Sequence, residues 1–252
     1  MIQLIDLHKR FGTGRWVTDG LNLEIPDGKM TAIIGRSGEG KSVLLKQMIG
    51  LIPPTSGAIN VDGVDLITAP SAQKEKILQQ FGYVFQFAAL LDSLNILRNI
   101  GITLFEQGKS EEEVLPIVKE KLRLVNLSDD ILDKNPSELS GGMRKRVGLA
   151  RTLISQPKII LYDEPTTGLD PITTRIIHEL MFDMQKKFNM TSVVISHDVE
   201  IFKYADRVAL LHQGKIRYCG DAKTVWESDN PYLYQFIRGL PEGPMDAETA
   251  KH

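Results

Sequence analysis

The chain has 252 residues, of which 42% are hydrophobic and 25% charged, and its formal net charge is −2. This composition predicts a soluble globular chain with a large core, and the small charge argues against sequence-independent binding of nucleic acid. The single cysteine, Cys219, excludes an internal disulfide and fits a reducing compartment. Residues 1–11 lack a signal-peptide pattern, and no apolar run approaches the roughly 20 residues that span a bilayer, so a membrane role would require separate membrane subunits.

The first chemically informative segment is Gly35–Ser42, which has the form G-x-x-x-x-G-K-S. It follows the apolar run Met30–Ile34 and precedes residues with helical spacing, so it is expected to join a strand to a helix that ends at Gly50. Backbone N–H groups of such a loop and the positive end of the helix dipole bind the β- and γ-phosphates of a nucleotide. Lys41 would add a positive charge, and the Ser42 hydroxyl would bind Mg²⁺.

The middle of the chain is predicted to be helical. Asn95–Phe105 and Leu115–Val125 carry aliphatic residues at three- and four-residue spacings. Ser110 and the glutamates after it form a possible helix cap, but Pro116 would then lie inside the helix. The second helix is therefore expected either to begin near Leu115 or to bend there.

These patterns predict one domain over residues 1–240. Short apolar runs with glycine turns place an α/β core in residues 1–86 and 156–225, with a helical insert over about 87–155. Residues 241–252 are expected to form a flexible tail.

A glycine pair precedes another predicted helix, in the segment Leu139–Met143. Ser140 is the expected N-cap, and Gly141 and Gly142 would present backbone N–H groups to a phosphate. Together with the phosphate-binding loop, this pair suggests an ATP molecule held between two copies of the chain.

Two carboxylates end the next apolar run, Lys158–Glu164, which has the pattern of a strand buried on both faces. Asp163 is predicted to bind Mg²⁺ through water, and Glu164 to polarise the water that attacks the γ-phosphate. The alternative is a strand that simply ends in solvated acids, which is common when no phosphate-binding loop is present.

Two further segments lie at predicted element ends. Asp170 is the expected N-cap of a helix that starts at Pro171, and a contact to a partner copy would be additional to that role. After the apolar run Thr191–Ile195, His197 is placed to bond the γ-phosphate and hold the attacking water, although a lone histidine there can also be a helix-start or core residue. Pro231–Gly239 is predicted to form a short helix, and disorder is expected after Leu240.

In this order the motifs resemble those of an ATP-binding cassette (ABC) nucleotide-binding subunit over nearly the whole chain. The resemblance implies an α/β fold with a P-loop NTPase (RecA-like) core, an antiparallel β subdomain and an inserted α-helical subdomain. It also implies an ATP hydrolase that works with Mg²⁺ as a homodimer. The matching segments are Gly35–Ser42 (Walker A), Ile160–Glu164 (Walker B), Leu139–Met143 (signature), Gln86 (Q-loop), Gly168–Asp170 (D-loop) and His197 (H-loop).

Particular roles follow from the resemblance alone. Phe11 occupies the place of an aromatic that stacks on adenine, with Trp16 as a substitute, and Gln86 would sense the γ-phosphate and bind Mg²⁺ together with Ser42 and Asp163. The implied catalytic residues are Lys41, Glu164 and His197. The implied nucleotide-binding residues are Phe11, Gly35, Arg36, Ser37, Gly38, Glu39, Gly40, Lys41, Ser42, Val43, Gln86, Ser140, Gly141, Gly142 and Asp170.

One position departs from the family pattern. Met143 stands where most members have glutamine, and methionine cannot donate a hydrogen bond. Contact to the partner's nucleotide is then expected from Ser140, Gly141 and Gly142, with Met143 facing the packing of its own helix.

Finer resemblance points to the ATPase subunit of bacterial Mla/Mce-type phospholipid transporters, carried by Gly35–Leu51, Val84–Ser93 and the LSGGM form of the signature. It implies two integral-membrane permease subunits, a periplasmic or membrane-anchored lipid-binding (Mce-type) protein, no nucleic acid, and a peripheral place on the cytoplasmic face of the bacterial inner membrane. As the alternative to a flexible tail, it also implies that residues 241–252 can dock on the partner ATPase subunit. The alternatives are an ABC transporter for another solute and a soluble ABC ATPase for iron–sulfur cofactor assembly.

Overall fold

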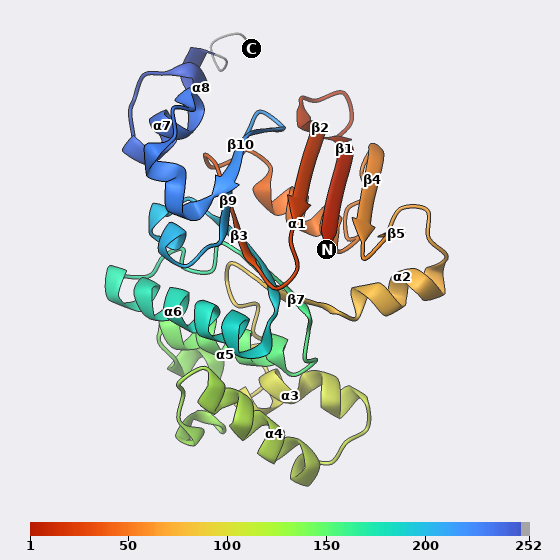
Figure 1. Cartoon of the computed structure of the whole chain (residues 1–252). Helices are drawn as coiled ribbons and strands as arrows, with labels where there is room; N and C mark the ends of the chain where they lie inside the picture. The colour runs from red at the N-terminus through yellow and green to blue at the C-terminus, as the bar shows by residue number, and fades with distance from the viewer. Residues whose placement is uncertain (248–252) are drawn as a thin grey trace. The chain divides into compact units, whose positions relative to one another are not determined.

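The computed structural model describes residues 1–247, and the chain divides into two compact units. One unit combines residues 1–78 with the part that follows residue 190, and the other consists of residues 79–190 (Figure 1). Residues 79–86 and 156–190 thus belong to the unit that carries the helices of the middle of the chain. The division into an ABC core and an insert of 87–155 stays a prediction.

The first unit contains two sheets. An antiparallel sheet has the strand order β2-β1-β4-β5, and a mixed sheet contains β10-β9-β3-β8, in which β3 runs parallel to both neighbours (Figure 1). The elements are β1 (Ile2–Arg10), β2 (Trp16–Ile25), β3 (Met30–Ile34), α1 (Lys41–Met48), β4 (Ser56–Val61), β5 (Val64–Asp65), α2 (Ser71–Leu78), β8 (Thr191–Ser196), the 3-10 helix η3 (Val199–Lys203), β9 (Arg207–His212), β10 (Lys215–Asp221), the 3-10 helix η4 (Ala222–Glu227), α7 (Pro231–Arg238) and α8 (Pro244–Ala247).

Continuous apolar runs explain the central strands of the mixed sheet. Every residue of β3 and β8 is buried, as are the last five residues of β9. Strands covered on both faces lose the alternation of apolar and polar residues, which is the pattern that the sequence shows here. Gln213 and Gly214 connect β9 to β10 with positive φ angles of 48° and 73°, as a two-residue turn that matches the strand twist requires.

The second unit pairs a short parallel ladder with helices. β6 and β7 run parallel, with Tyr83 opposite Leu161. The elements are β6 (Phe81–Val84), α3 (Ile96–Glu106), α4 (Glu111–Leu124), the 3-10 helices η1 (Asp129–Ile131) and η2 (Pro136–Glu138), α5 (Gly141–Leu153), β7 (Ile159–Asp163) and α6 (Pro171–Phe188).

The start of α4 excludes one of the two expected alternatives. The helix begins at Glu111 rather than near Leu115, because Ser110 and Glu113 form a complete capping box. Two backbone N–H groups of the first turn are thereby satisfied. Pro116 lies inside the helix, so this cap and the burial of Val114 and Val118 outweigh the hydrogen bond that proline cannot make.

The carboxyl-terminal segment also differs from expectation. The predicted helix is α7, which ends at Gly239 with φ 61°. Disorder was expected after Leu240, but Pro244–Ala247 form α8, and Met245 is buried with its backbone N–H donating to Gln235 Oε1 at 2.8 Å. The rest of the expected tail, residues 248–252, lies outside the described residues.

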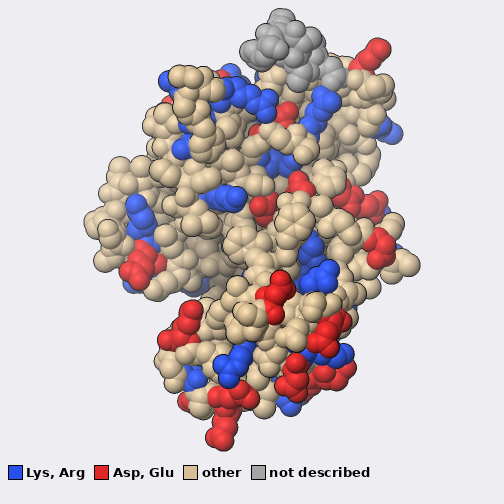
Figure 2. Space-filling view, turned by 180° about the vertical axis from the view of Figure 1, so that it is seen from behind, with Lys and Arg blue, Asp and Glu red and all other residues tan. Residues whose placement is uncertain are grey.

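Charged side chains are mixed on the face that Figure 2 presents. Lysine and arginine side chains lie among aspartate and glutamate side chains there, without a broad field of one sign. This distribution agrees with the formal net charge of −2.

Candidate functional site

Glycines give the phosphate-binding loop its backbone path. Gly38 and Gly40 have φ angles of 81° and 90°, which L side chains rarely adopt. A Cβ on Gly40 would lie 2.3 Å from Val17 Cγ1, and one on Gly35 would lie 2.4 Å from the carbonyl oxygen of Leu211. The first and sixth positions of the motif are therefore glycine because neighbouring strands leave no space for a side chain.

Lys41 places its ammonium group inside this loop. The residue is 4% exposed, and its Nζ donates to the carbonyl oxygens of Gly35 and Arg36, at 2.9 Å each. Ser42 follows in the first turn of α1, whose N-cap is Gly40. A positive charge and a helix N-terminus thus share the loop, which is the arrangement that binds phosphate.

Side chains from neighbouring segments hold the outside of the loop. Arg15 Nη2 donates to the carbonyl oxygen of Gly38 at 3.0 Å. The Glu39 carboxylate contacts His212 Nδ1 at 2.8 Å and accepts the Gln213 backbone N–H at 2.7 Å. His212 and Gln213 were not among the predicted site residues.

Two aromatic side chains in the first unit can serve as the adenine platform. Phe11 is 53% exposed and Trp16 37% exposed. Each has a cation against its ring, because Lys9 Nζ lies 4.8 Å from the Phe11 centroid and the Arg10 guanidinium lies 4.8 Å from the Trp16 centroid. The larger exposure of Phe11 favours it as the stacking surface.

The two predicted acids end β7 in the second unit. Asp163 is 6% exposed and accepts a 2.8 Å hydrogen bond from the Tyr83 hydroxyl. Glu164 has the unusual positive φ of 46° and accepts from Thr167 Oγ1 at 2.9 Å and from Gln86 Nε2 at 3.4 Å. The structure therefore brings Gln86 and Glu164 together, as the motif roles require.

Two groups beside these acids, the half-buried Tyr83 and the buried Lys145, have shifted pKa values. Burial raises the pKa of the Tyr83 hydroxyl, and the negative charge of Asp163 raises it further. The hydroxyl therefore stays protonated and donates the hydrogen bond to Asp163. Burial lowers the pKa of Lys145, and this effect exceeds the increase caused by the negative charges of Glu164 and Asp163. Lys145 Nζ also donates to the carbonyl oxygen of Gln86, which links α5 to the end of β6.

The segment after Gln86 is pinned to α5. Ala88 and Ala89 have positive φ angles of 59° and 49°, and their carbonyl oxygens accept from the Arg151 guanidinium at 2.8 and 2.7 Å. A Cβ on Gly148 would lie 3.2 Å from the Ala88 Cβ, so the helix and the loop are in close contact. No sequence signal marks Arg151 for this role.

The signature segment forms the N-terminus of α5. The Ser140 hydroxyl accepts from the Met143 backbone N–H at 3.3 Å, which confirms Ser140 as the N-cap. Ser140 and Gly141 are exposed, whereas Gly142 is buried against Thr173, whose Cγ2 would lie 2.5 Å from an added Cβ. Met143 is half-buried.

The helix that follows Gly168 begins as predicted. The Asp170 carboxylate accepts from the backbone N–H groups of Ile172 and Thr173 at 3.0 and 2.9 Å, and Pro171 is the first helical residue. The Thr173 hydroxyl donates to the same carboxylate at 2.6 Å, and these bonds lower the Asp170 pKa. Capping thus accounts for Asp170 within a single chain.

His197 lies directly after β8 and is exposed. Its neighbours form a compact turn, in which the Asp198 backbone N–H donates to Ser196 Oγ at 2.9 Å and the Asp198 side chain caps η3. The histidine therefore stands at the carboxyl end of a buried strand, as predicted.

The predicted residues divide between the two units. The loop Gly35–Ser42, Val43, Phe11 and His197 belong to the first unit, and Gln86, Ser140–Gly142, Asp163, Glu164 and Asp170 belong to the second. The predicted Mg²⁺ ligands, Ser42, Gln86 and Asp163, all offer oxygen atoms, which is the donor type that Mg²⁺ prefers. Within residues 1–247 no cluster of three or more histidine, cysteine, aspartate or glutamate side chains could hold a metal by itself.

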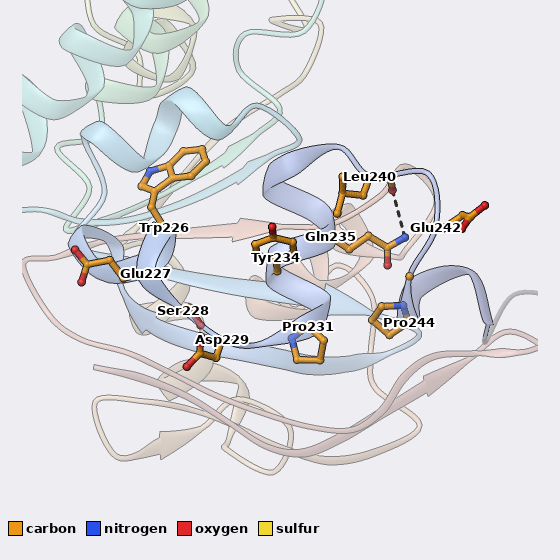
Figure 3. A pocket seen from close by; sticks show the side chains of 11 residues that line it. Trp226, Glu227, Ser228, Asp229, Pro231, Tyr234, Gln235, Leu240, Glu242 and Pro244 are labelled. Atoms are coloured by element: carbon orange, nitrogen blue, oxygen red, sulfur yellow. Dashed lines mark hydrogen bonds between the residues drawn. The ribbon is translucent and has the colours of Figure 1, made fainter.

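Two hollows lie at the carboxyl-terminal segment. The larger, of about 440 Å³, is lined by Trp226, Tyr234 and Leu240 among others and contains none of the predicted ATP-binding residues (Figure 3). The smaller, of about 220 Å³, is lined by Arg36 together with Phe236 and other residues of this segment. The segment after α7 therefore lies beside the phosphate-binding loop at Arg36.

A protein-family model described as ABC transporter matches residues 18–167. The chain belongs to the ABC transporter family. It is 39% identical over 252 residues to the "Probable ribonucleotide transport ATP-binding protein mkl" of Mycobacterium leprae, a match that covers 99% of this chain and 72% of that protein. It is also 39% identical over 213 residues to the "Energy-coupling factor transporter ATP-binding protein EcfA2" of Acetivibrio thermocellus, covering 83% and 74% of the two chains.

Solved structures confirm the predicted fold. The dimeric, post-hydrolysis structure of the ATP-binding cassette MJ0796 bound to ADP and Pi matches with a TM-score of 0.80 and 30% identity, over 88% of this chain and 99% of that one. The cbiO1 structure from Clostridium perfringens, part of the ABC transporter complex cbiONQ, matches with a TM-score of 0.81 and 28% identity over 95% of each chain.

The family fixes the activity and its cofactors. This ABC transporter subunit is an ATP hydrolase that binds ATP with Mg²⁺. Dimers of such ATPases working with membrane permease partners are general to the family. Across residues 1–247, no helix combines the length and the apolar character that crossing a membrane requires.

Proposed function

We propose that this ABC ATPase powers phospholipid transport between the inner and outer membranes of a bacterium, through two separate permease subunits and a lipid-binding Mce-type protein. It would act as a homodimer at the cytoplasmic face of the inner membrane. The observation that carries this proposal is the resemblance of Gly35–Leu51, Val84–Ser93 and the LSGGM signature to the Mla/Mce ATPases. The similarity to the mycobacterial mkl protein, which covers 99% of this chain and 72% of that protein, supports the coarser role of a transport ATPase.

In the proposed mechanism the loop Gly35–Ser42 binds the phosphates, and Lys41 neutralises their charge. Glu164 accepts a proton from the attacking water. The Thr167 hydroxyl, which donates to the Glu164 carboxylate at 2.9 Å, orients that carboxylate. Mg²⁺, held by Ser42, Gln86 and Asp163, would neutralise charge on the phosphate oxygens. Tyr83 fixes the Asp163 carboxylate for that role.

The dimer would complete each site. The exposed Ser140 and Gly141, with the backbone of Gly142, would contact the nucleotide bound to the partner copy, and His197 would hold the attacking water. ATP binding then favours the closed dimer, and hydrolysis releases it. Asp170 is proposed to contact the partner in addition to capping α6.

The loop after Gln86 is the proposed link to the permease. Phe85, Phe87 and Leu91 are 40%, 82% and 46% exposed, which is unusual for large apolar side chains so close together. An apolar helix of a membrane partner would cover such a surface. Arg151 ties this loop to α5, so a shift of one would move the other.

A second candidate is transport of ribonucleotides, because the printed name of the mkl relative assigns that function to the relative. Transport of another solute and a soluble ABC ATPase for iron–sulfur cofactor assembly are further alternatives. The ATPase site would be the same in each case, since the cargo of an ABC transporter is bound by other subunits.

Purification of the tagged chain from detergent-solubilised native membranes tests the proposal. We expect a permease and a lipid-binding protein to co-purify, with bound phospholipid identified by mass spectrometry. A matched Phe87→Asp variant should lose the permease but still hydrolyse ATP. Recovery with cytosolic assembly proteins alone would refute phospholipid transport. Recovery of a complex with a permease would also refute it if ribonucleotides, and not phospholipid, stimulate the ATPase activity of that complex.

A further inference from the structure

A carboxylate stands inside the loop that binds phosphate. Glu39 lies between the two glycines Gly38 and Gly40, at the turn that leads into α1. A negative charge so close to the nucleotide would repel the phosphates if its side chain faced them. In the structure the side chain of Glu39 is only 10% exposed.

Both carboxylate oxygens of Glu39 are engaged by the turn between β9 and β10. His212 Nδ1 lies 2.8 Å from Oε1, and the Gln213 backbone N–H donates to Oε2 at 2.7 Å. An ionised carboxylate can only accept hydrogen bonds, so the histidine nitrogen is the donor. The carboxylate therefore faces the end of β9.

His212 is itself held from a second direction. Its side chain is fully buried at the end of β9, and its ring centroid lies 5.8 Å from that of Tyr232, in the first turn of α7. The Arg217 guanidinium covers the Tyr232 ring at 4.9 Å, and Asn230 Nδ2 donates to the Arg217 carbonyl oxygen at 2.9 Å. The imidazole therefore has a fixed position.

The same strand end limits the loop at its other side. The Leu211 carbonyl oxygen is the atom that would meet a side chain at Gly35, and the smaller hollow of the carboxyl-terminal segment is lined by Arg36. The end of β9 and the turn after it thus contact the phosphate-binding loop at Gly35 and Glu39.

We propose that His212 and the Gln213 backbone N–H are positioning groups of the ATP site, which bind the Glu39 carboxylate and hold it away from the bound phosphates. This inference rests on the proposed role of Gly35–Ser42 as the phosphate site. Without the His212 donor, the carboxylate gains the freedom to turn into the loop, where it weakens nucleotide binding. Once Glu39 is replaced by a neutral residue, His212 has nothing to hold and its loss has no effect on affinity.

A double-mutant cycle tests this dependence in the full chain. Kd for Mg²⁺-ATP is measured for the unchanged protein, His212→Phe, Glu39→Ser and the double variant, with unfolding midpoints recorded without nucleotide. His212→Phe should raise Kd about tenfold, because repulsion between the released carboxylate and the phosphates is partly screened by solvent and salt. Glu39→Ser and the double variant should have Kd values within about twofold of each other, because the effect of His212 depends on the carboxylate.

Two further variants separate positioning from folding. His212→Asn keeps a side-chain N–H and should restore most of the affinity. Glu39→Asp keeps the charge but is too short to reach both donors, so it should bind Mg²⁺-ATP about tenfold more weakly than Glu39→Ser. This pair leaves His212 intact and decides the question even if His212→Phe fails to fold.

Steady-state kinetics provide the second readout. The His212→Phe loss should appear in KM with kcat nearly unchanged, since the base and the metal ligands are untouched. An equal loss of affinity in His212→Phe and the double variant, or equal effects of Glu39→Asp and Glu39→Ser, would overturn the inference. Lys41→Ala tests the phosphate site itself: if that variant binds ATP normally, the assignment of Gly35–Ser42 fails, independently of the Glu39 cycle.

Discussion

Replacement of Glu164 by glutamine should stop ATP turnover without disturbing the fold. Glutamine has nearly the same shape as glutamate. Its amide oxygen can still accept the hydrogen bond that the Thr167 hydroxyl donates to the Glu164 carboxylate at 2.9 Å. The amide cannot accept a proton from water, however, so the general base is lost. A positioned base contributes roughly 100- to 10,000-fold to rate, which corresponds to about 2.7–5.5 kcal/mol of barrier.

The assay measures single-turnover hydrolysis of Mg²⁺-ATP, together with the oligomeric state in the presence of ATP. We expect Glu164→Gln to bind ATP normally and to accumulate as the ATP-bound dimer. Glu179→Gln is the matched control, because Glu179 lies on the exposed side of α6 in an ion pair with Arg175 at 2.8 Å. The control should turn over normally. A Glu164→Gln rate within about threefold of the control would refute the assignment of the base.

Two other predictions concern the parts that support the site. Gly40→Ala should lower the stability of the nucleotide-free protein more than Gly38→Ala. Both residues have a positive φ, which costs an alanine about 1–2 kcal/mol. Only at Gly40 would the new Cβ also meet Val17 Cγ1, at 2.3 Å. Equal urea midpoints for the two variants would show that this contact relaxes without cost. Tyr83→Phe removes the donor to the buried Asp163 carboxylate and should cost about 1.5–3 kcal/mol of unfolding free energy, with a higher Mg²⁺ requirement for hydrolysis. An unchanged Mg²⁺ dependence would exclude a role for this hydrogen bond in orienting Asp163.

Local chemistry made several features predictable. The strand, loop and helix around Gly35–Ser42 follow from an apolar run, glycines and a helical pattern, and each of these acts within a few residues. The caps at Ser140 and Asp170 are likewise local, since a side-chain oxygen reaches the N–H groups two or three residues later. The buried strands β7 and β8 could be predicted from the sequence, because a strand buried on both faces has a continuous run of apolar residues.

The start of α4 and the helix α8 were harder to predict, because local sequence signals there conflict or are weak. At the start of α4 the capping box and Pro116 point in opposite directions, and sequence alone does not weigh them. The short helix α8 has few apolar residues, yet Met245 is buried against the carboxyl-terminal segment. Its order depends on contacts with residues such as Gln235, which lies ten positions earlier.

By itself, then, the sequence determined the motifs, their elements and the family of this ABC ATPase, because those depend on residues that are neighbours along the chain. Only the tertiary structure decided that Tyr83 serves Asp163, 80 residues later, and that Glu39 is held by His212, 173 residues later. Such pairs depend on which strands and turns lie side by side in three dimensions. A tyrosine in a short strand or a histidine at a strand end carries no local mark of the partner that folding brings to it.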